Sequence, residues 1–408
     1  MAELAVLRGV AAGDRPWEDY EAQPLTDKQV KLFLRLFLDV ADAVATTPAF
    51  SCQMPYKRWK ESKGRAVVID EAGNISRPDL YSVWGNTMIP LFLAGDEKQL
   101  PPAVMSANEK DNKGNALNRH AADAEISALE FFKVTGWPVF RLRTQLRMAR
   151  GLFTLSHMLF YSDVPCAYDR HCDIANPAHA VGRLMENFMR AKFPELRHSP
   201  RNELREVFVH CPGSESKVYA NGSQSNLWQV QIAVALLDQF VRAHRDRVDP
   251  ANIGIIAPYT ANVATINREL QNYDSLQGVE PAATVDSFQG REASIIVLIL
   301  GTTEKTGPGF TADEQRLNVA LSRQKSYLLI VGDINVTGPV VARAPAVGGG
   351  RGGRGGRDGR GGRGGYVPRA TDYFQIARSN GVVHIRAVAL RGLLLAIQNA
   401  GRVVTVAI

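Results

Sequence analysis

Short apolar runs recur along the chain, and each is bounded by polar or turn-forming residues. Such runs predict buried strands of a parallel sheet, because strands covered on both faces show no alternation of apolar and polar residues. Longer stretches between them, such as Leu227 to His244, have the apolar spacing of an amphipathic helix. The pattern therefore predicts an α/β protein with a doubly wound sheet. The predicted strands are Ala66 to Ile69, Leu91 to Ala94, Ile253 to Ala257, Ile295 to Leu300 and Tyr327 to Val331.

The length of the chain predicts more than one domain. The chain has 408 residues, and a single hydrophobic core rarely grows beyond about 250 residues, so we expect two or three domains. We place the boundary between the two groups of strands near Gln145. The predicted division is 1–144 for a first unit, 145–338 for a second, 339–368 for an Arg/Gly-rich segment and 369–408 for a C-terminal extension. The pattern gives that extension no function.

Most of the net positive charge lies in one segment near the end of the chain. The chain carries a formal charge of +7, but six arginines and one aspartate between Arg351 and Arg369 carry +5 of it. The rest of the protein is therefore close to neutral. Residues 348–365 are almost only glycine and arginine. They lack the apolar groups that offset the entropy of ordering, so we expect a flexible, cationic segment.

The Arg-Gly-Gly repeats in this segment, with Tyr366 nearby, resemble the RGG boxes of RNA-binding proteins. Arginine contacts phosphates and stacks on bases, and glycine lets the chain follow an irregular RNA. A flexible basic linker without a dedicated partner is the alternative. The arginines that the repeats offer for nucleic-acid binding are Arg351, Arg354, Arg357, Arg360 and Arg363.

No segment of the sequence predicts a membrane span or a secretory signal. The most apolar early stretch, Val30 to Val40, is interrupted by Arg35 and Asp39, so an amphipathic helix explains it better. The four cysteines lack the paired spacing of a zinc finger. His171-Cys172 and His210-Cys211 could converge on zinc, but ordinary reduced thiols are the favoured interpretation. We therefore expect a cytoplasmic or nuclear location.

Two adjacent carboxylates, Asp70 and Glu71, follow the first predicted strand. The carboxyl ends of parallel strands form the edge at which ligands of open α/β sheets bind. There Asp70 would hold Mg²⁺, directly or through water, and Glu71 would orient and deprotonate an attacking water. A solvated strand end is the plainer explanation of such a pair taken alone.

A more specific string, Gly95-Asp96-Glu97-Lys98-Gln99, follows the next predicted strand, with Pro101 and Pro102 behind it. Gly95 allows a tight exit from the strand, and the prolines stiffen the segment that follows. Asp96 and Gln99 would then lie where they could sense a γ-phosphate or its attacking water.

Three further strings run from Leu142 to Met148, from Thr284 to Glu292 and from Gln315 to Arg323. Arg147 and Arg323 belong to the second predicted unit, yet we expect them to reach the cleft, where guanidinium groups neutralise charge on a transferring phosphoryl group. A lone arginine is more often half of a surface ion pair. Two arginines inside ordered strings favour the catalytic explanation.

In this order the five strings resemble motifs II, III, the Gln-Tyr-Arg-Met segment, V and VI of superfamily 1B helicases. The branch they resemble is that of the nonsense-mediated-decay and Sen1-type RNA helicases. Ala257 to Thr260 resembles motif IV, and the resemblance extends from about Ala41 to about Asp333. It implies a RecA-like P-loop NTPase architecture, ATP and Mg²⁺ as ligands, and single-stranded RNA or DNA as the partner. It also implies that ATP hydrolysis drives translocation or unwinding.

Carried over position by position, the resemblance implies a role for each matching residue. At the nucleotide these are Asp70 for magnesium, Glu71 for activating water, Asp96 and Gln99 for the γ-phosphate, Arg147 and Arg323 as arginine fingers, Glu292 for the ribose and Gly290 for close approach of the backbone. The residues matched to the nucleic-acid backbone are Pro258, Tyr259, Thr260 and Thr284.

Several positions depart from the family pattern. Leu146 stands where the family has Tyr, Ala149-Arg150 replaces His-Pro, and Asn74 stands where many relatives have Gln. The changes to Leu and Asn affect packing and adenine-side contacts more than phosphate chemistry.

The largest departure concerns the phosphate loop, which holds the α- and β-phosphates with backbone N–H groups and a lysine. No Gly-Lys-Ser or Gly-Lys-Thr occurs in the sequence. Asp42 to Thr47 resembles the last strand before motif II, and 69 residues precede Asp70. We therefore expect a truncated first RecA-like domain and an isolated chain that is inactive as a motor. A non-catalytic RNA-binding scaffold, built on the second RecA-like domain and the RGG segment, is the alternative.

Overall fold

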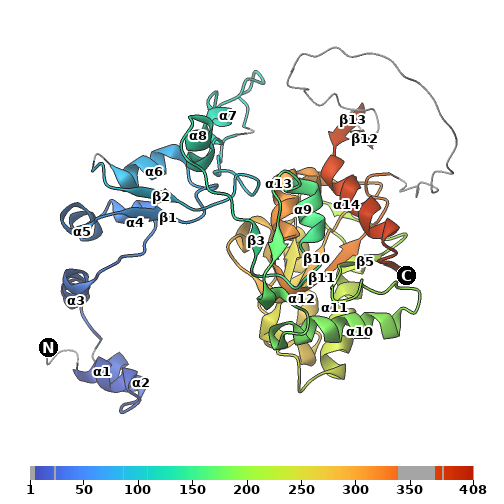
Figure 1. Ribbon diagram of the computed structural model, residues 1–408, viewed down its shortest axis with the longest axis horizontal. Helices are drawn as coiled ribbons and strands as arrows, with labels where there is room; N and C mark the ends of the chain where they lie inside the picture. Colours follow the sequence, from blue (N-terminus) through green and yellow to red (C-terminus); the bar gives the residue numbers. More distant parts are fainter. Residues whose placement is uncertain are drawn as a thin grey trace. The chain divides into compact units, whose positions relative to one another are not determined.

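The structure, a computed structural model, describes residues 5–22, 24–85, 87–107, 109–338, 373–378 and 381–407. The chain folds as two units (Figure 1). The first comprises Met1–Glu97 and Pro101–Trp137, and the second comprises Lys98–Leu100 and Pro138–Ile408. The short segment Lys98–Leu100 therefore belongs to the second unit, although the chain on both sides of it belongs to the first.

The first unit contains a pair of short parallel strands. They are β1, Val67–Ile69, and β2, Leu91–Leu93, which confirm two of the predicted strands. Helix α3, Asp27–Val40, confirms the predicted amphipathic helix and begins at a capping box formed by Thr26 and Gln29. The other helices are α1 Ala5–Ala11, α2 Trp17–Ala22, α4 Pro48–Ser51, α5 Tyr56–Lys63, α6 Arg77–Trp84, α7 Ala121–Ala124 and α8 Ala128–Val134.

Residues Asp42 to Thr47 do not form the strand that the sequence predicts, so that prediction is wrong. The Thr47 side chain instead caps α4 by accepting a hydrogen bond from the Phe50 N–H at 3.4 Å. Pro48 follows at the start of the helix, where its fixed φ suits helical geometry. Local capping therefore decides the conformation here.

Helices cover one face of the β1–β2 pair. Val67 and Ile69 are buried together with Leu80 of α6, whereas Val68 is 70% exposed and Phe92 is 60% exposed. Successive side chains of a strand point to opposite faces, so the exposed residues share the second face. The prediction that these strands are buried on both faces is wrong, because among the described residues the helices that pack on the pair, α6 and α8, cover one face.

The second unit is built on a sheet of parallel strands in the order β14-β5-β11-β10-β8-β9. Along β10, Ile295 and Val297 belong to one core, and Ile296 and Leu298 belong to the other. Both faces are therefore buried, which confirms the predicted doubly wound α/β class. The strands are β5 Val207–His210, β8 Ile253–Ala257, β9 Ala283–Thr284, β10 Ala293–Ile299, β11 Gln324–Gly332 and β14 Val403–Thr405.

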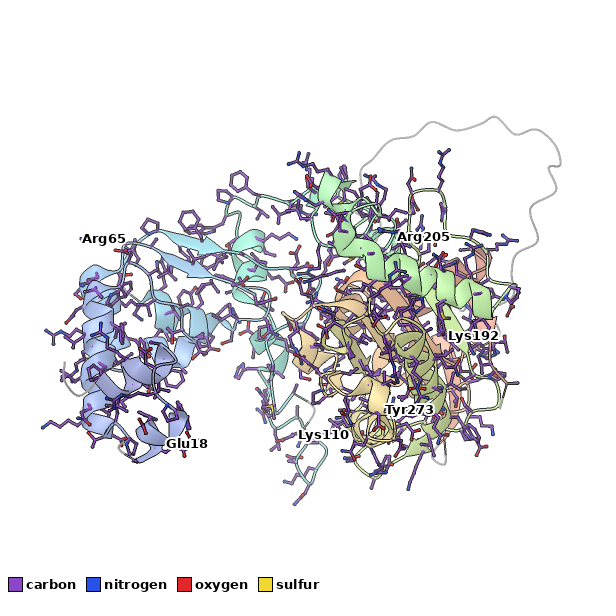
Figure 2. All side chains as sticks on the ribbon, turned by 90° about the horizontal axis from the view of Figure 1, so that it is seen from below. Glu18, Arg65, Lys110, Lys192, Arg205 and Tyr273 are labelled. Carbon is purple, nitrogen blue, oxygen red and sulfur yellow. The ribbon has the colours of Figure 1, made fainter. Side chains whose placement is uncertain are left out.

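Helices α10, α11 and α12 cover the first core, and α9, α13 and α14 cover the second. Figure 2 shows α10 on the outside of the unit, with Lys192 in its last turn. Helix α11 begins where the Asn226 side chain accepts a hydrogen bond from the Gln229 N–H at 3.1 Å. The bounds are α9 Thr154–Phe160, α10 Ala180–Lys192, α11 Leu227–Ala243, α12 Thr260–Leu270, α13 Glu314–Ala320 and α14 Val388–Asn399.

In the described part of the second unit, three strand pairs lie outside the main sheet. They are β3 Thr144–Gln145 with β4 Ala167–Tyr168, β6 Lys217–Val218 with β7 Gln224–Ser225, and β12 Tyr373–Arg378 with β13 Gly381–Arg386.

Strand β14 pairs with β5, and a buried ion pair lies next to it. Arg402, just before β14, is 1% exposed, and its guanidinium binds the Glu186 carboxylate of α10 at 3.0 Å (Nη1–Oε1) and 2.6 Å (Nη2–Oε2). Tyr327 of β11 donates to the same carboxylate at 3.2 Å. The backbone carbonyl oxygen of Arg205 also accepts from Arg402 at 3.0 Å. These hydrogen bonds compensate the desolvation of both charges.

The Arg/Gly-rich segment and its arginines from Arg351 to Arg363 lie outside the described residues. The chain on both sides of them belongs to the second unit, since Val336 and Leu390 lie in one buried core. The Arg391 guanidinium in the first turn of α14 also donates to the Thr337 carbonyl oxygen at 2.7 Å. The segment is thus an insertion within the second unit.

We expect Arg402→Ala to destabilise the second unit. The change leaves the Glu186 carboxylate buried without its cation, and loss of one half of a buried ion pair costs about 3–5 kcal/mol. Chemical denaturation followed by circular dichroism measures the free energy of unfolding. Arg245→Ala, at an exposed position of the same unit, is the matched control, with an expected change within about 0.5 kcal/mol. Equal stability of the two variants would contradict this role of Arg402.

Candidate functional site

Asp70 and Glu71 follow β1 at its carboxyl end, within the first unit. Asp70 is exposed, and its Oδ1 accepts a hydrogen bond from the Glu71 backbone N–H at 2.9 Å. Glu71 has a φ of 52°, a left-handed conformation that costs a residue with a side chain about 1–3 kcal/mol. Such strain clusters at sites where a side chain must keep one direction. The open Asp70 carboxylate suits Mg²⁺, which keeps much of its water shell.

The loops after β1 and β2 contact each other through their backbones. A Cβ on Gly95 would lie 2.6 Å from the Ala72 nitrogen, and a Cβ on Gly73 would lie 2.4 Å from the Asp96 carbonyl oxygen. Both positions therefore require glycine. The packing brings Asp96 next to the loop that carries the two carboxylates.

Gln99 lies in the short segment that belongs to the second unit. Its Oε1 accepts a hydrogen bond from Arg323 Nη2 at 3.0 Å. The neighbouring Lys98 binds Asp163 at 2.8 Å (Nζ–Oδ1), and the Lys98 carbonyl oxygen accepts from Asn318 at 2.9 Å. The hydrogen bond from Lys98 holds the pKa of Asp163 well below its usual range. These contacts attach Gln99 to the unit that carries Arg323.

Arg323 lies between the end of α13 and the start of β11 and is 3% exposed. Its Nε donates to the Val319 carbonyl oxygen at 3.1 Å, and its Nη2 donates to Ser322 Oγ at 2.9 Å. Burial of a guanidinium is costly unless its N–H groups are satisfied. The surrounding acceptors therefore fix the direction of this cation.

Arg147 and Glu292 form an ion pair at 2.5 Å (Nε–Oε2). Lys325 contacts the other carboxylate oxygen at 2.8 Å, and Arg147 Nη1 also donates to the Ser322 carbonyl oxygen at 3.2 Å. Partial burial acts to raise the pKa of Glu292, but the hydrogen bond from Lys325 and the charge of Arg147 outweigh it, so that this pKa is lowered. Glu292 is therefore ionised at neutral pH and carries two cations beside it.

Gly290 lies in the turn that leads into β10. It is exposed and has a φ of 76°, a conformation that residues with a Cβ rarely adopt. Phe288 is buried beneath this turn, and the Arg291 guanidinium lies 4.5 Å from the centre of its ring. The turn thus exposes its backbone just before Glu292.

Pro258, Tyr259 and Thr260 follow β8, and Thr284 is the last residue of β9. Thr260 is exposed, and its Oγ1 lies 3.3 Å from Ser223 Oγ. Pro258 and Thr284 are half-buried, whereas Tyr259 is 3% exposed. Of these predicted nucleic-acid contacts, Thr260 is thus the most open and Tyr259 the least.

The structure separates the candidate residues of the second unit between two edges of one sheet. Gly290 and Glu292 precede β10, and Arg323 precedes β11, so they lie at the amino edge. Thr260 follows β8 and Thr284 ends β9, so both lie at the carboxyl edge. Because all six strands are parallel, these edges are opposite to each other.

Two contacts at the carboxyl edge were not predicted from the sequence. Phe310, in the short helix η7 Gly309–Ala312, stacks on Tyr259, with 5.0 Å between ring centroids and 18° between ring planes. Arg316 of α13 binds Asp286 through two hydrogen bonds of 3.0 and 3.1 Å. The sequence signal for Phe310 is weak, since an aromatic residue beside glycines is common in loops.

Within the described ranges, no group of three or more His, Cys, Asp or Glu side chains is placed to hold a metal ion. Cys172 and Cys211 are both buried, and burial raises the pKa of Cys211 to about 12. Cys211 is therefore a neutral thiol at neutral pH. In the same ranges, no helix is long and apolar enough to cross a membrane.

The family model described as an AAA domain (AAA_12) matches residues 124–335, just over half of the chain. The chain is 32% identical over 292 residues to the regulator of nonsense transcripts 1 homolog of Neurospora crassa, which covers 68% of this chain and 23% of that protein. It is 30% identical to the ATP-dependent helicase NAM7 of Saccharomyces cerevisiae, over 77% of this chain and 30% of that protein.

The probable helicase senataxin of Mus musculus is 28% identical, over 66% of this chain and 9% of that protein. The chain spans about a quarter or less of the length of several such relatives. Among solved structures, the arterivirus nonstructural protein 10 helicase matches with a TM-score of 0.27 and 15% identity, over 64% of this chain and 38% of that one.

The matched family region contains the Thr284 and Arg323 strings and the strands that position them. The resemblance inferred from the order of the five strings is thereby confirmed. The chain belongs to the AAA_12 family of AAA domains, and it carries a superfamily 1B helicase-like domain of the nonsense-mediated-decay and Sen1 type.

Proposed function

We propose that this chain is part of an ATP-dependent motor that moves on or unwinds single-stranded nucleic acid. The observation that carries the proposal is the division of candidate residues between two edges of one sheet. Arg147, Glu292 and Arg323 belong to the amino edge, and Thr260 and Thr284 belong to the carboxyl edge. A motor needs a nucleotide site and a nucleic-acid site joined by a stiff element, and a sheet buried on both faces is such an element.

The amino edge is suited to bind the anionic part of a nucleotide. Arg147 and Arg323 offer guanidinium groups that would neutralise charge on phosphoryl oxygens. Glu292 holds Arg147 at 2.5 Å. A ribose hydroxyl that binds Glu292 would compete with this pair and free the Arg147 side chain to turn towards the phosphates. The ion pair would thus couple ribose binding to the position of Arg147.

The sequence provides a carboxylate that could bind Mg²⁺ but no phosphate loop that could hold ATP. Asp70 offers an exposed carboxylate at a strand end, and a metal there would neutralise phosphate charge. The sequence contains no Gly-Lys-Ser or Gly-Lys-Thr to cradle the α- and β-phosphates. For this chain alone we therefore propose little or no ATP hydrolysis.

A non-catalytic RNA-binding scaffold is the second candidate function, and the Arg-Gly-Gly repeats of residues 348–365 favour it. In such a protein the carboxyl-edge residues and the arginines of residues 348–365 would bind RNA, and Glu71 and Arg323 would have no reaction to serve. Nucleotide binding by the chain, measured with and without single-stranded RNA, separates the candidates. Magnesium-dependent nucleotide binding that becomes tighter when RNA is present supports the motor. RNA binding with the same affinity in the presence and absence of nucleotide supports the scaffold.

Purified, unchanged chain is expected to release phosphate from ATP only at the background rate, with or without RNA, because the arginines need a γ-phosphate held in place. A phosphate-release assay measures this. Glu71→Gln is the test variant, and Glu109→Gln, exposed in the same unit, is its control. Hydrolysis that Glu71→Gln abolishes and Glu109→Gln preserves would overturn the expectation.

Replacement of the five arginines from Arg351 to Arg363 by serine is expected to weaken RNA binding at low salt. Each phosphate contact adds about 0.7 to the slope of log affinity against log salt for a single strand, so the slope should become shallower by up to about 3.5. Anisotropy titrations of a labelled oligouridylate between about 50 and 200 mM salt measure the slope. Serine at the exposed Arg245 and Arg247 controls for lost charge alone. An unchanged affinity for RNA at low salt would show that the segment does not contribute to RNA binding.

A further inference from the structure

Phe310 is an exposed aromatic side chain with a fixed position at the carboxyl edge of the second unit. It lies in η7, between β10 and α13, and 49% of its surface is exposed. Single exposed aromatic residues are common on protein surfaces. Phe310 differs from them in the set of contacts that hold its ring and its backbone.

Tyr259 supports Phe310 from the interior. The two rings are stacked at 5.0 Å, and the Phe310 backbone N–H donates to Tyr259 Oη at 2.9 Å. Gln224 Nε2 donates to the same oxygen at 3.4 Å. Since Tyr259 is buried, Phe310 is the ring of this stacked pair that is open to a ligand.

Gly309 makes the close approach of these two residues possible. Its φ is 52°, and a Cβ at this position would lie 1.8 Å from Tyr259 Oη. A side chain at position 309 would therefore push the Phe310 backbone away from Tyr259. The local sequence is thus built around the contact between the two rings.

Arg316 restrains the ring from a second direction. Its Cζ lies 5.1 Å from the centre of the Phe310 ring, and Asp286 fixes the guanidinium through two hydrogen bonds. A side chain that is already ordered loses little entropy when a ligand binds to it. Tyr259 and Arg316 thus both lie against the Phe310 ring, and a ligand would contact the ordered part of the ring that these two side chains leave exposed.

The residues next to Phe310 indicate what would bind there. Phe310 lines a small, mostly apolar pocket with Pro258 and Val285, and the exposed Thr260 adjoins Tyr259 along the chain. A hydroxyl group and a partly exposed aromatic ring at one edge of a sheet suit a single strand, whose phosphates bind the hydroxyl while its bases stack. A stable protein partner would need a broader apolar surface than one ring.

We propose that Phe310 stacks on a base of single-stranded nucleic acid bound along the carboxyl edge of β8, β9 and β10. The inference rests on the proposed function and names the side chain that contacts a base there. Every base has a flat π face, so stacking holds a strand without selecting its sequence. Phe310 would thus contact a base while Thr260 and Thr284 contact the backbone.

The test compares two ligands and four proteins. The ligands are a labelled oligouridylate and a chain of equal length with abasic sites in place of its bases. The proteins are the unchanged chain, Phe310→Ala, Phe310→Tyr and Phe140→Ala. Phe140 is 93% exposed in the same unit and provides the matched control. Fluorescence anisotropy at about 0.2 M salt, where arginine–phosphate contacts are weakened, gives the dissociation constants.

Phe310→Ala is expected to weaken binding of the oligouridylate by about 5- to 150-fold, the range for loss of one stacked base. The affinity for the abasic chain should not change. Phe310→Tyr should restore binding, and Phe140→Ala should have no effect. Equal weakening for both ligands would mean that Phe310 only supports the local fold, and the inference would be overturned.

The outcomes also separate this inference from the proposed function. If the unchanged chain binds neither ligand, the proposed function itself fails. If the unchanged chain and Phe310→Ala bind the oligouridylate equally well, only the stacking role fails.

Photo-crosslinking provides a second measurement that needs no variant. The unchanged chain is irradiated with an oligouridylate that carries iodouridine, and mass spectrometry locates the crosslinked peptide. The peptide that contains Phe310 is expected among the products. Crosslinks that form elsewhere and never on this peptide would overturn the inference.

Discussion

The parallel pairing of six strands is the constraint on which the second unit depends. Parallel neighbours share one direction, so each segment that follows a strand reaches one edge and each segment that precedes a strand reaches the other. Gly290 and Arg323 consequently lie at one edge, and Thr260 and Phe310 lie at the other. Helices cover both faces of the sheet, which leaves the edges open to ligands.

The amino edge concentrates positive charge without exposing all of it. Glu292 faces both Arg147 and Lys325, so this group of three side chains keeps one net positive charge. Arg323 adds a further cation whose direction is set by Gln99, the Val319 carbonyl oxygen and the Ser322 hydroxyl. Partial burial lowers the local dielectric response, and an anion at this edge is attracted more strongly than it would be at an open surface.

Sequence patterns predicted the strands that are buried along their whole length. They also predicted the family, from the order of the five motif-like strings. The strand Ile253–Ala257 was predicted at its observed bounds because every residue in it is buried. The strand Val403–Thr405 was not predicted, because three residues give no periodicity and the partner strand lies far earlier in the chain. Family resemblance suggested a strand at Asp42 to Thr47, but helix capping overrides it. Phe310 was not predicted as a site residue, because only the folded structure shows that the Tyr259 ring stacks against it.

The place of β14 also sets the order in which the second unit is completed during synthesis. Its partner β5 is made early, whereas β14 and Arg402 leave the ribosome only after the Arg/Gly-rich segment. Until then β5 has an unpaired edge, and the Glu186 carboxylate has no cation to bind. Unpaired edges of this kind promote wrong association in partly folded chains. The nascent protein is therefore most vulnerable during the time that the ribosome needs to translate the glycine-rich segment and the residues up to Thr405.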